Sequence, residues 1–156
     1  MTNAAVALPP IDAPLEARVA LVHDFMVERG GAERVLLELS SAFPGAMVHT
    51  AMFDPAGTYS KLSELRVNTL VPDRFPFLTK EHRRSLPVAV RAFRQAEIEA
   101  DILIANSSGL SHLAGCTGRR VVYCQTPTRW LHRSEDYLRR VPEAGARLIA
   151  SGLQRR

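Results

Sequence analysis

Residues 18–51, RVALVHDFMVERGGAERVLLELSSAFPGAMVHTA, decide the fold of this chain. The run 18–23 is short, apolar and rich in branched side chains, which is typical of a buried strand in a parallel sheet. After a Gly-Gly turn, apolar residues recur at helical spacing until a Pro-Gly pair ends the pattern. Residues 46–51 form a second apolar run, so the stretch predicts a strand, a glycine turn, a helix and a second strand.

Three more strands and another helix are expected toward the C-terminus. Residues 65–70, 101–105 and 120–124 are short apolar runs. Ser85 is a favourable N-cap for a helix that runs to Glu99, with a proline in its first turn. Strands that alternate with helices predict an α/β fold, with a Rossmann-like parallel sheet flanked by helices.

The composition suits one globular domain, because 46% of the 156 residues are hydrophobic and 23% are charged. Residues 1–17 lack apolar periodicity and a basic start, so we expect a disordered leader before a domain over residues 18–141. The two cysteines form neither a CxxC motif nor a cluster with histidine, so we expect no metal site and a reducing, cytoplasmic location. Cys124 is expected to be a small core residue.

The formal net charge of +4 favours anionic partners. The basic residues are not interleaved with aromatic ones and no nucleic-acid motif is present, so nucleic acid is not expected as a partner. The basic segment 80–94 follows the apolar residues Phe75, Phe77 and Leu78. Such a segment either contacts an anionic membrane surface or forms a solvated helix face, and both interpretations stay open.

Polar segments follow three of the expected strands, at residues 23–33, 106–109 and 125–130. Open α/β sheets bind ligands outside the carboxyl ends of their strands, so these segments are expected to converge on one site. The turn at Gly30 and Gly31, just before a helix, either brings main-chain N–H groups to a phosphate or is a plain tight turn. Its pattern is neither a GxGxxG nor a Walker motif, so both interpretations stay open.

The three segments contain motifs that occur together in one known family. They are VHDFMVERGGAER at residues 22–34, a Ser-Ser-Gly turn followed by His112, and YCQTPTRW at residues 123–130. In this order they resemble the family 4 glycosyltransferases, over residues 18–137. The resemblance implies a GT-B architecture, in which one Rossmann-like domain binds the acceptor and a C-terminal one binds the nucleotide-sugar donor. It also implies a retaining hexose transfer to a glycan or lipid-linked acceptor, without a metal or further cofactor.

The resemblance also implies roles for individual residues. Gly30 and Gly31 would lie near the donor diphosphate, and Glu33 would be a polar contact on the acceptor side of the same loop. Gln125 and Thr126 would line the reaction centre, where the family's commoner motif has a His-Thr pair. A glutamine amide forms hydrogen bonds but does not carry a proton as imidazole does. This position therefore cannot do general acid–base work here, although it suffices for orienting sugar hydroxyls.

Five further side chains are candidates for substrate contacts. Asp24 either binds an acceptor hydroxyl or caps the main chain of a loop. His112 is either aimed at the cleft or a surface residue of a short helix, and Arg129 pairs either with a phosphate or in a surface salt bridge. Ser107 and Ser108 are unsuited as hydrolase nucleophiles, because no GxSxG motif surrounds them.

The leading hypothesis is the acceptor-binding part of a glycosyltransferase, with a cytoplasmic location that extends to the inner membrane face if the acceptor is lipid-linked. Residues 142–156 would then begin the segment that leads to a donor-binding domain, supplied by a longer chain or by a split partner. The alternative is a non-catalytic module that binds a sugar or a nucleotide. A small complete esterase or reductase is disfavoured, because GxSxG and GxGxxG are both missing.

Overall fold

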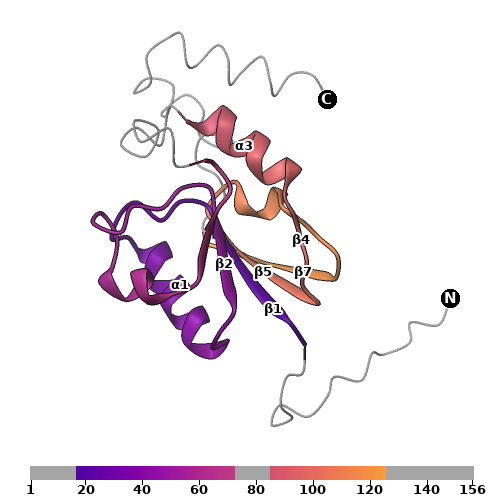
Figure 1. Cartoon of the computed structure of the whole chain (residues 1–156), viewed down its shortest axis with the longest axis horizontal. Coiled ribbons are helices and arrows are strands. Elements are labelled where there is room, and N and C mark those ends of the chain that lie inside the picture. The colour runs from indigo at the N-terminus through magenta and orange to yellow at the C-terminus, as the bar shows by residue number, and fades with distance from the viewer. Residues whose placement is uncertain (1–16, 73–84, 126–156) are drawn as a thin grey trace, which may run out of the picture.

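The computed structural model describes residues 17–72 and 85–125, and these form an α/β fold (Figure 1). All five strands of the main sheet are parallel, in the spatial order β3-β2-β1-β5-β7. Their bounds are Val19–His23 for β1, Met47–Thr50 for β2, Val67–Thr69 for β3, Ile102–Ser107 for β5 and Arg119–Cys124 for β7. The expected parallel α/β fold is therefore confirmed.

Helices and a small second sheet connect these strands. They are α1 (Gly31–Ala42), α3 (Leu86–Gln95), the 3-10 helices η1 (Ser60–Glu64) and η2 (Ser111–Leu113), and the two-stranded sheet of β4 (Glu97–Ile98) and β6 (Gly115–Cys116). The helix expected to reach Glu99 ends at Gln95, because the next residues leave the helix and pair with β6. Residues 1–16 of the leader expected over residues 1–17, and the segment 142–156, lie outside the described residues.

The two α-helices of the described residues, α1 and α3, pack on opposite faces of the sheet. On one face, Leu36 of α1 packs in a cluster with Leu21 of β1. On the other face, Phe93 of α3 packs in a cluster with Val22 and Leu103. Adjacent residues of β1 enter different cores because successive side chains of a strand point to opposite faces. Full burial of a side chain such as Phe93 stabilises the fold by about 1.5–3 kcal/mol.

The order of the strands reverses next to β1. From β1 the chain proceeds outward to β2 and β3, and it then returns to place β5 on the opposite side of β1. The loops that leave the carboxyl ends of β1 and β5 therefore diverge, and such a switch point is where open α/β sheets bind ligands. His23 and Asn106 are paired in register at this point, near the ends of their strands.

Strand β7 differs from the other strands because all six of its residues are exposed. It pairs with β5 on one side, and neither hydrophobic cluster of the described residues includes a residue of β7. The prediction that Cys124 is a core residue is wrong, because it lies exposed at the end of this strand. An edge strand that neither α1 nor α3 covers keeps apolar side chains at the surface, whatever its sequence pattern.

Candidate functional site

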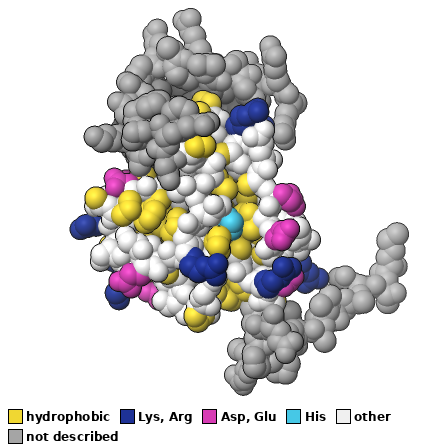
Figure 2. Space-filling model, in the orientation of Figure 1, with side chains coloured by type: hydrophobic (Ala, Val, Ile, Leu, Met, Phe, Trp, Pro, Cys, Tyr) yellow, Lys and Arg dark blue, Asp and Glu magenta, His cyan; other side chains and the backbone are white. Residues whose placement is uncertain are grey.

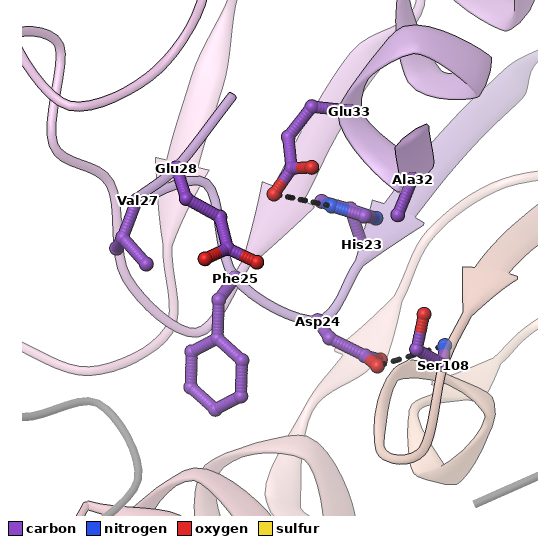
Figure 3. Close-up of a pocket in the computed structure, with 8 residues that line it drawn as sticks. All are labelled: His23, Asp24, Phe25, Val27, Glu28, Ala32, Glu33 and Ser108. Carbon is purple, nitrogen blue, oxygen red and sulfur yellow. Dashed lines mark hydrogen bonds and ion pairs between the residues drawn. The ribbon is translucent and has the colours of Figure 1, made fainter. Parts of the chain in front are cut away.

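A pocket of about 100 Å³ opens at the switch point of the sheet, at the carboxyl ends of β1 and β5. Its lining comes from the loop after β1, the first turn of α1 and the loop after β5 (Figure 3): His23, Asp24, Phe25, Val27, Glu28, Ala32, Glu33 and Ser108. Two of the three polar segments expected to converge are therefore brought together here. The third begins at Gln125, which is joined to the segment 106–109 by a hydrogen bond to Asn106.

A buried histidine and a buried glutamate form the inner wall of the pocket. His23 is 2% exposed, and its Nε2 lies 3.7 Å from Oε1 of Glu33. Its Nδ1 lies 3.0 Å from the main-chain oxygen of Asn106. The other oxygen of Glu33 accepts a hydrogen bond of 3.0 Å from the main-chain N–H of Gly30. Glu33 therefore holds the start of α1 against the end of β1, in addition to lining the pocket.

The two glycines before α1 differ in what surrounds them. A Cβ atom at Gly30 would lie 2.6 Å from Oε2 of Glu33, which is 4% exposed and held in place by its hydrogen bond. A Cβ atom at Gly31 would meet no described atom within 4 Å. Gly30 is therefore required for the close approach of the glutamate carboxylate, whereas Gly31 leaves the first turn of the helix accessible.

Asn106 links the ends of three strands, although sequence reasoning did not single it out as a site residue. Its Nδ2 donates a hydrogen bond of 2.9 Å to the main-chain oxygen of Ala32, in the first turn of α1. Its Oδ1 accepts a hydrogen bond from Nε2 of Gln125, directly after β7. The main-chain N–H of Gln125 donates to the oxygen of Ser107 at 3.0 Å. The signal available in the sequence was a polar residue at the end of an apolar run, and the structure buries this residue fully.

The carboxylate of Asp24 holds the loop after β5. Its Oδ2 accepts the main-chain N–H of Ser108 at 2.9 Å, and its Oδ1 accepts those of Leu110 and Ser111 at 3.1 and 2.6 Å. The interpretation of Asp24 as a cap of loop main chain is therefore confirmed. Asp24 caps a loop and also lines the pocket, where it is 7% exposed.

Ser107 lies next to the carboxylate of Asp24, and His112 lies next to Ser107; neither residue lines the pocket. The Oγ of Ser107 is 3.5 Å from Oδ1 of Asp24 and 3.2 Å from Nδ1 of His112. Ser108 is exposed and lines the pocket, whereas Ser107 is 3% exposed and does not. His112, in η2, is partly buried and is not part of the lining.

The lining is acidic. It contains the carboxylates of Asp24, Glu28 and Glu33, one imidazole, and no lysine or arginine. The nearest basic residue in the sequence, Arg29, donates a hydrogen bond to the main-chain oxygen of Thr58 instead. Figure 3 shows the carboxyl group of Glu28 directed toward the centre of the lining residues. Within the described ranges, no group of three or more His, Cys, Asp or Glu side chains could hold a metal ion.

No family model, curated protein or solved structure matches this chain. Thr126 and Arg129, two of the expected site residues, lie outside the described residues. The described helices include none that is both long and apolar enough to cross a membrane.

Proposed function

We propose that this chain is the acceptor-binding domain of a GT-B glycosyltransferase that transfers a hexose from a nucleotide-sugar to a glycan or lipid-linked acceptor. The observation that carries the proposal is the acidic pocket at the switch point between β1 and β5. The position is the one at which parallel α/β sheets bind ligands. The motifs at residues 22–34, 107–112 and 123–130 add the resemblance to family 4.

The charges of the pocket favour an acceptor with hydroxyl groups. Carboxylates accept hydrogen bonds and donate none, so Glu28 and Glu33 suit the O–H donors of a sugar. Phe25 adds an aromatic wall against which the apolar face of a sugar ring could pack. A phosphate about 4 Å from one carboxylate would be opposed by about 4 kcal/mol at a typical surface dielectric. We therefore assign this pocket to the acceptor rather than to the diphosphate of the donor.

The donor diphosphate has a separate place in this proposal. The N–H of Gly30 is already bonded to Glu33, so the N–H of the exposed Gly31, at the start of α1, would contribute instead. Gln125 would orient a hydroxyl of the transferred sugar, since its main chain and its amide are both held by β5. The donor-binding domain and Thr126 would complete the reaction centre.

Surface charge is compatible with a membrane-linked acceptor but does not favour it. Arg91 and Arg94 of α3 are exposed. On the face drawn in Figure 2, however, basic and acidic side chains are scattered around hydrophobic ones and form no single basic area among the described residues. A cytoplasmic location with a soluble or a lipid-linked acceptor is therefore part of the proposal, and a glycan acceptor is the simpler choice.

The test is a donor-turnover assay on the purified protein, alone and with a family 4 donor-binding domain supplied, in which released nucleoside diphosphate is measured over a panel of nucleotide-sugars and acceptors. We expect turnover only in the combined sample. Glu28→Gln should raise the acceptor KM, while Glu38→Gln, an exposed charge-matched change farther along α1, should not. Sugar binding without turnover in either sample would instead favour the non-catalytic module.

A further inference from the structure

His112 is connected to the pocket through two other side chains, although it does not line the pocket itself. Its Nδ1 lies 3.2 Å from Oγ of Ser107, and that Oγ lies 3.5 Å from Oδ1 of Asp24. The Oγ of Ser107 also accepts a hydrogen bond of 3.2 Å from the main-chain N–H of Gly109. Three groups therefore surround one hydroxyl, and the hydrogen-bonding capacity of a hydroxyl limits how they can be arranged.

A serine hydroxyl has one hydrogen to donate and two lone pairs that accept. The carboxylate of Asp24 only accepts, so the contact between Asp24 and Ser107 requires the hydroxyl hydrogen. The N–H of Gly109 takes one lone pair. The remaining lone pair faces Nδ1 of His112, which must then donate. In the opposite arrangement, with Ser107 donating to His112, the contact between Ser107 and Asp24 would hold no hydrogen, and Oδ1 of Asp24 would keep only its main-chain donors Leu110 and Ser111.

We infer that Asp24 and Ser107 fix the neutral ring of His112 as the tautomer with hydrogen on Nδ1, so that Nε2 is a hydrogen-bond acceptor. Free histidine side chains carry either tautomer, and the partner of one nitrogen decides which is present. Within residues 17–72 and 85–125, His112 forms a hydrogen bond through Nδ1 and none through Nε2. With no hydrogen-bond partner among these residues, Nε2 is able to accept a hydrogen bond from a hydroxyl that reaches it.

The assignment of a ligand to Nε2 rests on the proposed function, since a sugar acceptor supplies the hydroxyl, whereas the tautomer itself does not. Ser107 and Asp24 are positioning residues in this scheme, because they act on the ligand through His112. The carboxylate of Asp24 thus lines the pocket and, through Ser107, also fixes the tautomer of His112 in η2.

The tautomer can be measured by long-range ¹H–¹⁵N NMR correlation on protein labelled with ¹⁵N-histidine, at mildly alkaline pH where imidazole rings are neutral. His112→Gln identifies the signals of His112 by removing them. We expect the protonated nitrogen to be Nδ1 in the wild-type protein. Ser107→Ala should move the hydrogen to Nε2 or give a mixture, whereas Ser108→Ala, in the same loop with an exposed side chain, should leave the tautomer unchanged.

A wild-type ring with hydrogen on Nε2 would overturn the inference without any variant, so a misfolded Ser107→Ala protein would not leave the question open. Persistence of the Nδ1 hydrogen in well-folded Ser107→Ala would overturn the role of Ser107. A titration with methyl hexosides should shift the Nε2 resonance as it accepts a hydroxyl. An unchanged Nε2 resonance at saturation would overturn the ligand contact, while binding itself, followed at other signals, would report separately on the proposed acceptor function.

Discussion

Replacing Asp24 by alanine tests how far one carboxylate organises the site. The change removes the acceptor of three main-chain N–H groups in the loop after β5. The N–H groups of Leu110 and Ser111 belong to residues that are 3% and 0% exposed, whereas Ser108 is exposed and its N–H can turn to water. The loss of stability should therefore come mainly from the two buried donors.

Each buried donor left unpaired costs about 1–3 kcal/mol, so the two together give about 2–6 kcal/mol. Asp24 lines the pocket, and water entering the vacated space would satisfy part of this demand. We therefore expect the free energy of unfolding to fall by about 2–4 kcal/mol, a large part of the roughly 5–15 kcal/mol typical of a domain. Urea denaturation followed by circular dichroism measures the loss directly.

Asp54→Ala is the matched control, because it removes the same group from an exposed turn. Oδ1 of Asp54 accepts the main-chain N–H of Ala56 at 3.1 Å, where water can replace it. This variant should lose only about 0.5–1.5 kcal/mol. If Asp24→Ala proved no less stable than Asp54→Ala, with equal m-values, the three hydrogen bonds would not hold the loop and our account of the site would be refuted.

Three further changes test other parts of the structure. Among the described residues, Thr58 Oγ1 is buried without a hydrogen-bond partner, so Thr58→Val should be neutral or stabilise the protein by about 1 kcal/mol in thermal or urea denaturation; a loss of more than that would mean the hydroxyl is bonded. Gly30→Ala should lower the free energy of unfolding by about 1–3 kcal/mol, because the new Cβ displaces the Glu33 carboxylate. Gly31→Ala, where a Cβ has open space, should stay within about 0.5 kcal/mol of wild type. Equal losses in the two variants would contradict the different surroundings of these glycines. The side-chain hydrogen bond from Arg18 holds the pKa of Asp101 below its usual range, so the pair contributes stability above the unfolded pKa of about 3.9 that is lost as pH falls through the folded value. Both side chains are exposed, so Asp101→Asn should flatten the acid limb of a stability–pH profile only slightly, and a large change near neutral pH would disprove this origin.

The parallel sheet was accessible from the sequence because its signals are local. Each apolar run is bounded by glycine, proline or a polar turn. Within residues 18–51, the helix is indicated by apolar residues at helical spacing and the strands by short apolar runs. The pairing of β4 with β6 was missed because it joins two-residue strands 18 positions apart, from Glu97 to Gly115. Cys124 was misplaced because an apolar run does not tell an edge strand from a central one.

For the candidate site, only the segments that form it could be predicted from the sequence. That residues 23–33 and 106–109 meet follows from parallel strands ending at one edge. Which side chain holds which was not accessible, because the partners of Asp24 and Asn106 lie 84 and 74 positions away in the chain. Such contacts depend on the register between β1 and β5, and no local pattern encodes that register.

The bond between Asn106 and Gln125 makes these two positions dependent on each other. The amide of Gln125 supplies the hydrogen. Nδ2 of Asn106 donates to Ala32 and also contacts Nδ1 of His23, so the oxygen of Asn106 is left to accept. A histidine at position 125 would satisfy that oxygen only with a ring N–H turned toward it, and only its other ring nitrogen would then be left for a further partner. Replacing Gln125 by histidine would therefore change not one side chain but a coupled pair, and the energetic effects of changing Asn106 and Gln125 should be non-additive.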